Sequence, residues 1–312
     1  MWNHIADHIS QSTGTPFTIS HRRSVGGGSV NQAYAIVDQA MVDQSSDRSH
    51  GDSRGQQSGG QPQEQAYFLK LNDASRVAMF EAEALGLRQM AQSQTIKVPD
   101  PICWGTVEGS SYIVLEWLDI GYGTHQSWQG MGQQLAAMHQ VTSPKGFGWD
   151  QNNTIGFIPQ MNDWTDSWAI FFRDHRIGYQ LKLARKRGGH FPKQHELLEA
   201  IPELLADHHP QPSLVHGDLW SGNAAVTQEG DPIIFDPATY YGDREVDLAM
   251  SELFGRFPED FYRSYNQAFP IEPGYTQRKP LYNLYHILNH FNQFGGGYES
   301  QANSMINRLL KR

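Results

Sequence analysis

The stretch that decides the fold reads HGDLWSGN at residues 216–223, and PIIFD follows it at residues 232–236. The apolar run at 233–235 is typical of a short buried strand that ends at Asp236. Residues 224–226 are its expected antiparallel partner, because the QEGD sequence between them at 228–231 has the composition of a turn. A hairpin of this kind predicts that Asp218, Asn223 and Asp236 lie together at one site.

These three polar residues favour phosphoryl transfer as the chemistry. That reaction needs a carboxylate to accept the proton of the acceptor hydroxyl, and oxygen ligands to hold Mg²⁺ on the phosphates. We interpret Asp218 as the catalytic base, and Asn223 and Asp236 as the metal ligands, in the layout of a kinase catalytic loop. An HGD tripeptide alone is weak evidence, but an asparagine 5 residues and an aspartate 18 residues after Asp218 make the pattern specific.

The composition of the chain excludes several other classes. A length of 312 residues suffices for two domains or one bilobal enzyme. The net charge of −9, without a long run of Lys or Arg, argues against nucleic acid as a partner. No signal peptide and no apolar membrane segment is recognisable, so a cytoplasmic location is expected. Cys103 is the only cysteine, which excludes an intramolecular disulfide and a cysteine-based zinc site.

The first part of the chain, residues 1–118, is predicted to be a small β-rich lobe that binds a nucleotide. Residues 25–37 indicate a strand, a glycine loop and a second strand, and strands are also expected at 66–71 and 112–118, with a helix at about 77–90 between them. The segment 38–65 is rich in Ser, Gln, Gly and Asp, so we interpret it as a flexible insertion within a hairpin. Its role and any influence on self-association stay open.

Residues 119–312 are predicted to form a larger, mainly helical lobe that carries the catalytic loop and the substrate site. Apolar residues recur at helical spacing in three stretches, at 131–138, 164–175 and 197–205. The expected fold class is therefore α+β, with a bilobal protein kinase-like fold.

Several weaker signals indicate the nucleotide site. Glycines leave backbone amides open to phosphate oxygens, a strand lysine can bind phosphates, and a helix glutamate can orient that lysine. Glu83 is preferred over Glu81 for this last role, because residues 87 and 90 then continue its helical spacing. The adenine is expected against the backbone of the segment that joins the two lobes. The predicted nucleotide-binding residues are Gly26, Gly27, Gly28, Ser29, Lys70, Glu83, Glu116, Trp117 and Leu118.

The chain also resembles the fructosamine kinase family, the ketosamine 3-kinases, within the aminoglycoside phosphotransferase and protein kinase-like superfamily. The resemblance covers nearly the full length. Four motifs carry it: GFIPQMNDW at 156–164, LVHGDLWSGN at 214–223, FDPATYYGD at 235–243 and LNHFNQFG at 288–295. Trp220 is the discriminating residue, since relatives that phosphorylate choline or aminoglycosides commonly differ after HGDL. The segment 38–65 departs from the family because it is longer than usual.

The resemblance implies ATP-dependent, Mg²⁺-dependent phosphorylation of the 3-hydroxyl in the sugar moiety of ketosamines such as ribulosamines or fructosamines. It also implies that Trp220 and His290 help to bind that sugar. Phosphate on C3 lies β to the C2 carbonyl and is a good leaving group, so elimination can follow and release the amine. The partner is then a small-molecule or protein-bound ketosamine, and a monomer is expected.

Two alternatives stay open on the sequence alone. The first is a kinase for another hydroxylated amine, such as an aminoglycoside, choline or an amino sugar. The second is a catalytically silent nucleotide-binding protein. Two nearby residues have less specific roles. Asp247 either braces the catalytic loop or caps a helix, and the structural role is favoured. His216 is expected to pack and hydrogen-bond under the loop and not to transfer protons.

Overall fold

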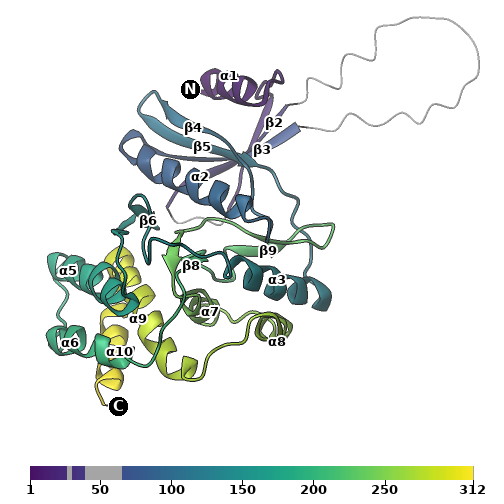
Figure 1. The fold of residues 1–312 in the computed structure, drawn as a ribbon. Helices are drawn as coiled ribbons and strands as arrows, with labels where there is room; N and C mark the ends of the chain where they lie inside the picture. Colours follow the sequence, from purple (N-terminus) through teal and green to yellow (C-terminus); the bar gives the residue numbers. More distant parts are fainter. Residues whose placement is uncertain (27–29, 39–64, 312) are drawn as a thin grey trace, which may run out of the picture. The chain divides into compact units, whose positions relative to one another are not determined.

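The structure is a computed structural model, and it describes residues 1–26, 30–38 and 65–311. The chain forms two compact units (Figure 1). The first contains residues 1–81 and 100–118, and the second contains residues 82–99 and 119–312. The chain passes from the first unit to the second after Leu118, and the segment 82–99 also belongs to the second unit.

The first unit is built on a five-stranded antiparallel sheet in the order β1-β2-β3-β5-β4. Its strands are β1 (His21–Ser24), β2 (Gln32–Asp38), β3 (Gln65–Asp73), β4 (Pro101–Val107) and β5 (Ser110–Glu116). Alternation along β3 places Tyr67, Leu69 and Leu71 in one apolar cluster, as the sequence predicts. Helix α1 (Trp2–Thr13) adds Ile5 and Ile9 to the same cluster.

The predicted strand before the glycines is wrong in position. Strand β1 ends at Ser24, before Val25, and all four of its residues are exposed. An edge strand without a buried face has no apolar alternation, so the sequence pattern could not locate it. Strands β2 and β3 pair directly up to Asp38 and Gln65, as expected for a hairpin that carries an insertion. Residues 39–64 themselves lie outside the described part of the chain.

The second unit contains most of the helices and three short antiparallel strand pairs. Its helices are α3 (His125–Met138), α4 (Trp168–Phe171), α5 (Tyr179–Lys186), α6 (Gln194–Leu204), α7 (Glu245–Ser251), α8 (Glu259–Ala268), α9 (Tyr275–Phe294) and α10 (Tyr298–Leu309), with a π-helical segment (Phe172–Gly178) between α4 and α5. Its strand pairs are β6 (Asn153–Ile155) with β7 (Ile158–Gln160), β8 (Ser213–Val215) with β11 (Tyr240–Gly242), and β9 (Ala224–Val226) with β10 (Pro232–Ile234). Helix α2 (Val77–Gln92) begins in the first unit and ends in the second.

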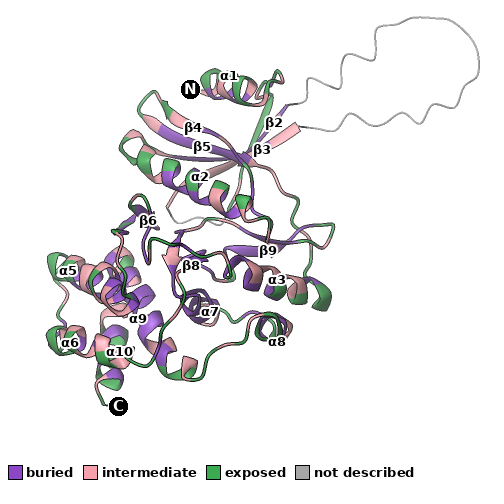
Figure 2. Ribbon diagram, in the orientation of Figure 1, coloured by how far each residue is buried: buried purple, intermediate pink, exposed green. Residues whose placement is uncertain are grey.

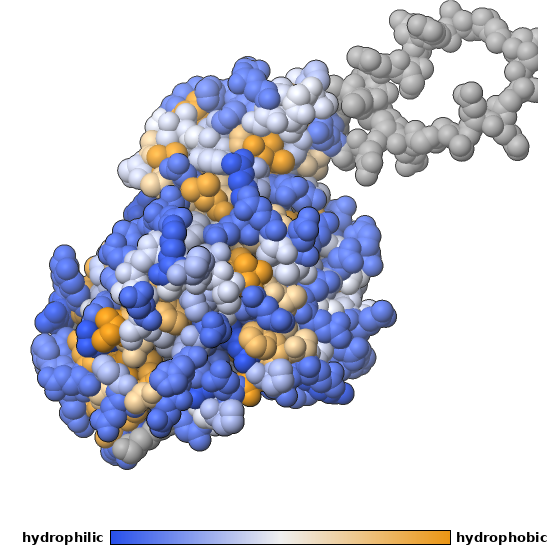
Figure 3. Space-filling view, viewed as in Figure 1, coloured by the Kyte–Doolittle hydropathy of each residue, from blue (hydrophilic) through white to orange (hydrophobic). Residues whose placement is uncertain are grey.

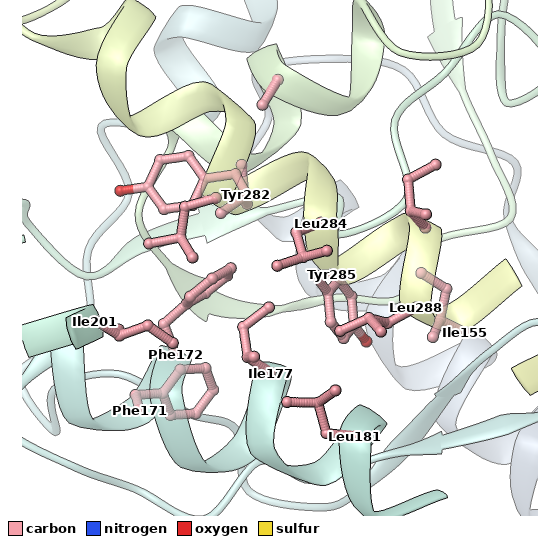
Figure 4. Close-up of a cluster of buried hydrophobic side chains, with 14 of the residues drawn as sticks. Ile155, Phe171, Phe172, Ile177, Leu181, Ile201, Tyr282, Leu284, Tyr285 and Leu288 are labelled. Atoms are coloured by element: carbon pink, nitrogen blue, oxygen red, sulfur yellow. The ribbon is translucent and has the colours of Figure 1, made fainter. Parts of the chain in front are cut away.

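Helix α9 lies at the centre of the second unit. Every residue from Leu281 to Asn289 is buried, so the helix is covered on all sides (Figure 2). Its apolar side chains meet those of α4, the π-helical segment, α5 and α6, and Figure 4 shows this cluster, which includes Phe171, Ile177 and Leu288. The predicted stretch at 164–175 supplies this core, although Trp164 and His175 at its ends are only partly buried. Within the described residues, no helix has the length and apolarity needed to cross a membrane.

The close approach of α3 and α8 generates a stability prediction. A Cβ atom added at Gly132 would lie 2.2 Å from Ser264 Oγ and 2.3 Å from the Phe261 carbonyl oxygen, so no side chain fits there without moving backbone. We expect Gly132→Ala to lower the free energy of unfolding by about 1–3 kcal/mol, measured by urea denaturation. Gly130→Ala is the matched control in the same helix, because its Cβ meets only Pro232 Cγ at 3.4 Å. Equal stability of the two variants would contradict the prediction.

Candidate active site

The sequence motif folds as the loop and hairpin that its composition indicates. The loop 216–223 joins β8 to β9, and β9 pairs with β10 in the register Ala224 with Ile234 and Val226 with Pro232. The backbone N–H of Phe235 donates to the carbonyl of Asn223 at 3.0 Å, which extends the ladder by one step. Asp236 therefore follows the hairpin directly beside Asn223.

Asn223 connects the two aspartates of the motif. Its Nδ2 donates to the carbonyl oxygen of Asp218 at 2.9 Å, to Asp218 Oδ2 at 3.2 Å and to the carbonyl oxygen of Asp236 at 3.5 Å. The structure thus brings together the three residues that the sequence predicted to meet.

The electrostatics of Asp218 indicate a site for a cation. Burial raises the pKa of Asp218 to about 8, and the neighbouring Asp236 carboxylate acts in the same direction, while the hydrogen bond from Asn223 opposes them. Two carboxylates held this close repel each other unless a positive charge lies between or beside them. Carboxylate and amide oxygens are the donors that Mg²⁺ prefers, so the residues present fit a magnesium ion.

The backbone around the aspartates is tightly constrained. Gly217 has φ of 82°, and a Cβ there would lie 2.2 Å from the carbonyl oxygen of Ala238. Asp236 has φ of 59°, in the left-handed region that a non-glycine residue rarely adopts. Such strain persists only where the surroundings impose it, and it is concentrated at functional sites.

His216 is held in one neutral form by its two partners. The Phe235 carbonyl lies 3.0 Å from its Nε2 and can only accept, so Nε2 carries the proton. Its Nδ1 then accepts the backbone N–H of Asp218 at 3.2 Å. The ring is completely buried, and this burial lowers the pKa of His216. These contacts support the packing role expected for His216 and occupy both of its ring nitrogens, so neither is open to a substrate proton.

Asp247 braces the catalytic loop, which decides between the two roles that the sequence left open. Its Oδ2 accepts the backbone N–H of His216 at 2.7 Å, and its Oδ1 accepts that of Gly217 at 2.8 Å. Burial acts to raise the pKa of Asp247, but the hydrogen bonds from His139 and from the Gly217 N–H act against burial, and the pKa lies below its usual range. The ionised carboxylate therefore stays in place under the loop.

A buried chain of side chains supports Asp247 from behind, and sequence reasoning missed it. His139 donates from Nε2 to Asp247 Oδ2 at 3.1 Å, and its Nδ1 lies 2.8 Å from the hydroxyl of Tyr265. Arg244 donates from Nη1 to the same hydroxyl at 3.3 Å. The only sequence signal was the position of His139 at the end of the apolar stretch 131–138, and nothing related it to Tyr265 or Asp247.

The β6–β7 hairpin, which includes the first part of the GFIPQMNDW motif, contributes an unpredicted set of contacts, which we name the amide clamp. Asn153 Nδ2 donates to the carbonyl oxygen of Thr239 at 2.8 Å, and Gln160 Nε2 donates to that of Ala238 at 3.0 Å. Gln160 Oε1 accepts the Tyr285 hydroxyl at 2.6 Å. The clamp fixes the segment that follows Asp236, so the β6–β7 hairpin helps to position that residue.

Arg176 supports the amide clamp from the π-helical segment. It is completely buried and donates to Asn162 Oδ1 at 2.9 Å and to the Met161 carbonyl at 2.6 Å. Its guanidinium also lies 4.0 Å from the ring centroid of Tyr240 and 4.5 Å from that of Phe171. The charge is therefore held by carbonyl dipoles and ring faces.

The two residues predicted to bind substrate lie in the second unit, and both are partly exposed. The indole of Trp220 folds back over Gly222, where an added Cβ would lie 2.4 Å from its Cζ2 and Cη2 atoms. Glycine at 222 is therefore required for this position of the ring. His290 lies near the end of α9, and its Nδ1 donates to the carbonyl oxygen of His286 at 2.8 Å.

The predicted nucleotide residues lie on several elements. Lys70 is buried in β3. In the register of the sheet it lies opposite Ala33 of β2 and Ile113 of β5. Glu83 is buried, whereas Glu81 is exposed.

The structure describes the glycine loop only in part and the segment 116–118 in full. Gly26 follows β1, while Gly27, Gly28 and Ser29 lie outside the described residues. Glu116 ends β5, and its backbone N–H donates to the carbonyl of Asp100 at 2.8 Å. Trp117 lies 6.4 Å from Phe68 between ring centroids, and Leu118 is the last residue of the first unit.

Comparison with known proteins decides the family. The family model described as fructosamine kinase matches residues 1–312. The chain belongs to the fructosamine kinase family. It is 56% identical over 310 residues to a probable ketoamine kinase of Synechocystis, covering 99% of this chain and 97% of the relative. It is 44% identical over 251 residues to the chloroplastic protein-ribulosamine 3-kinase of Arabidopsis thaliana, covering 79% of this chain and 76% of the relative.

Solved structures agree with the family and with the predicted fold. A putative fructosamine-3-kinase from Haemophilus somnus superposes with a TM-score of 0.87 at 32% identity, covering 99% of this chain and 98% of that one. A streptomycin and ATP complex of an aminoglycoside phosphotransferase matches with a TM-score of 0.57 at 11% identity, which shows a shared fold alone. The fructosamine kinase family member is thus a kinase, a phosphotransferase that uses ATP, and the predicted kinase-like α+β fold is confirmed.

The bracing carboxylate generates a prediction about rate and stability. In Asp247→Asn, the amide has one oxygen acceptor where the carboxylate has two, so it cannot bond His216, Gly217 and His139 together. We expect the free energy of unfolding to fall by about 1–3 kcal/mol, and kcat to fall about 10- to 100-fold because the loop loses its exact position. Urea denaturation and steady-state kinetics at a temperature where the variant is folded measure the two effects.

The control for this prediction is Asp260→Asn. Asp260 also lies in the first turn of a helix, α8, but it pairs with His125 at the surface. We expect it to keep both the wild-type kcat and nearly the wild-type stability. A folded Asp247→Asn variant with the kcat of Asp260→Asn would show that the loop does not depend on the brace.

Proposed function

We propose that this fructosamine kinase family member transfers the γ-phosphoryl group of ATP to the 3-hydroxyl of a ketosamine, the sugar adduct of an amine such as a ribulosamine or a fructosamine. The observation that carries the proposal is the Asp218, Asn223 and Asp236 constellation, with Asn223 bonded to both aspartates. Relatives named ketoamine kinase and protein-ribulosamine 3-kinase, similar over most of the chain, support the substrate class.

In this proposal Asp218 is the catalytic base. Its carboxylate takes the proton from the 3-hydroxyl as the oxygen forms its bond to the γ-phosphorus, and the bond from that phosphorus to the ADP oxygen breaks. Asn223 and Asp236 are the proposed ligands of Mg²⁺, which neutralises charge on the phosphates when it is bound. Burial and, after it, the charge of Asp236 raise the pKa of Asp218 to about 8, and a cation held at Asp236 would oppose the second of these two effects and favour the ionised base.

The nucleotide site is proposed from the order of residues along the chain. Gly26, Gly27, Gly28 and Ser29 are assigned to the phosphates together with Lys70, and the backbone of 116–118 is assigned to the adenine. Glu83 is proposed as the partner of the lysine in preference to Glu81, because residues 87 and 90 continue its helical spacing. A buried lysine needs a compensating charge, which a glutamate or a phosphate can supply.

The proposed product explains a repair role. Phosphate at C3 is β to the C2 carbonyl, so elimination of phosphate leaves a fragment that releases the amine without a second catalytic site. Trp220 and His290 are proposed to bind the sugar, and Gly222 is proposed to make room for the indole. The cytoplasmic location and the monomeric state remain predictions from the sequence.

The test replaces the base. We expect Asp218→Asn to lower kcat for a ketosamine by about 10²- to 10⁴-fold, while nucleotide affinity is largely kept. Mg²⁺-dependent ADP release is measured with ribulosyl-lysine and fructosyl-lysine, beside an aminoglycoside and choline. Asp231→Asn is the matched control, because Asp231 lies exposed in the turn of the same hairpin. The proposal fails if Asp218→Asn retains most of the wild-type kcat, or if the wild type turns over only the aminoglycoside or choline.

A further inference from the structure

The second half of helix α2 belongs to the second unit and packs on the chain beside Asp236, and the reaction described so far gives it no role. A Cβ added at Gly86 would lie 3.1 Å from Thr239 Oγ1 and 3.8 Å from Pro237 Cγ. Thr239 Oγ1 also donates to Met90 Sδ at 3.3 Å. The helix therefore lies directly against the residues that follow Asp236.

The chain that continues from α2 contacts the other side of Asp236. Lys97 forms a parallel bridge with Ile233 of β10, and the backbone N–H of Ile234 donates to the carbonyl oxygen of Lys97 at 3.1 Å. Strand β10 ends two residues before Asp236. Residues 86–97 thus hold the chain before and after this aspartate, whose φ of 59° persists only in constraining surroundings.

The polar part of this attachment is the side-chain amide of Gln89. Its Oε1 accepts the indole N–H of Trp149 at 2.6 Å, and its Nε2 donates to the hydroxyl of Tyr241 at 3.0 Å. An indole N–H can only donate, so the amide oxygen has to face Trp149 and the NH₂ group faces Tyr241. We name Gln89, Trp149 and Tyr241 the glutamine fork.

The two partners of Gln89 lie on segments that are bonded to each other. Gly148 and Tyr241 exchange two backbone hydrogen bonds, at 2.8 and 3.0 Å. The backbone N–H of Trp149 donates to the carbonyl oxygen of Asn162 at 2.9 Å, and the Trp149 side chain is buried in the core cluster of the second unit. Gln89 therefore joins α2 to a connected part of the second unit.

A second glutamine on the same helix shows what is particular to Gln89. Gln92 lies three residues further along and is exposed, whereas Gln89 is half-buried. The surface in Figure 3 is mainly hydrophilic with small, separate hydrophobic patches, so a glutamine that faces water is ordinary there. Taking a side-chain amide out of water is unfavourable unless it is hydrogen-bonded, and Gln89 bonds through both its oxygen and its NH₂ group.

The fork acts on Glu83 through the helix. Glu83 precedes Gln89 by six residues on α2, and it also belongs to the second unit. Continuous backbone hydrogen bonds make a helix stiff over so short a length, with a rise of about 1.5 Å per residue. Fixing Gln89 therefore fixes Glu83, the proposed partner of the phosphate-binding lysine.

Building on the proposed function, we infer that Gln89 is a positioning residue for the nucleotide phosphates. The glutamine fork fixes α2 against the segment after Asp236, so that Glu83 and the proposed metal ligand keep one separation. The fork then sets the affinity for the Mg²⁺-nucleotide and the rate of phosphoryl transfer. Binding of the ketosamine does not depend on it, because Trp220 and His290 lie on other elements.

The test removes the two hydrogen bonds and keeps the length of the side chain. Methionine is a good helix former but offers no amide group. We expect Gln89→Met to raise the Kd of Mg²⁺-ADP and the KM for ATP by about 5- to 20-fold, and to lower kcat by a similar factor. The KM for ribulosyl-lysine is expected to change less than twofold. Calorimetric titration with Mg²⁺-ADP and steady-state kinetics measure these constants at a temperature where the variant is folded.

The matched control is Gln92→Met, the same substitution on the exposed side of the helix, which is expected to keep all wild-type constants. Tyr241→Phe removes only the hydroxyl of the fork, and we expect a smaller rise in the Kd of Mg²⁺-ADP, of about 2- to 5-fold. Added to Gln89→Met, it is expected to cause no further loss, because the bond that it removes is already absent.

Several results would overturn the inference. These are an unchanged Kd for Mg²⁺-ADP in Gln89→Met, equal increases in both KM values, the same losses in Gln92→Met, or losses that multiply in the double variant. If Gln89→Met does not fold, Tyr241→Phe decides, and wild-type constants in it count against the fork. Failure of the proposed function shows differently, as a wild-type enzyme that binds Mg²⁺-ADP and turns over no ketosamine.

Discussion

The buried carboxylate of Asp247 is the interaction on which the candidate active site depends. It holds two successive backbone N–H groups of the catalytic loop, and His139 and Tyr265 hold it in turn. A charge without exposure to water is tolerated only when it is fully hydrogen-bonded, so the whole arrangement must form together. The loop geometry, including the left-handed Gly217, follows from this one anchor.

Asp236 is held in place by contacts from a different part of the chain, the β6–β7 hairpin. The amide clamp of Asn153 and Gln160 binds the carbonyls just after Asp236, and Tyr285 of the central helix α9 binds the clamp. The site is therefore supported by an enclosed helix and a short hairpin that are hydrogen-bonded to each other. A strained φ at Asp236 can persist in such surroundings because relaxing it would break several buried hydrogen bonds.

Local sequence patterns predicted much of the fold and the three central residues of the site. The 224–236 hairpin was predicted from an apolar run and a turn, and Asp218, Asn223 and Asp236 followed because a hairpin joins its own ends. Strand β3 and the core helices were visible as period-two and helical patterns. The edge strand β1 was misplaced, since an exposed strand carries no such pattern. His139, Tyr265, Arg244 and the amide clamp were missed because their partners lie far away in sequence.

The sequence by itself determined the kinase-like α+β class, the three polar residues of the hairpin and the family signature around Trp220. These features depend on residue type and spacing within short segments. The local backbone geometry of a strand, turn or helix fixes where such residues lie relative to one another. Only the tertiary structure decided that Asp247 braces the loop, that His216 is a neutral packing residue, and that the amide clamp holds the segment after Asp236. Each of these is a contact between segments that the chain brings together only when the core of the second unit packs.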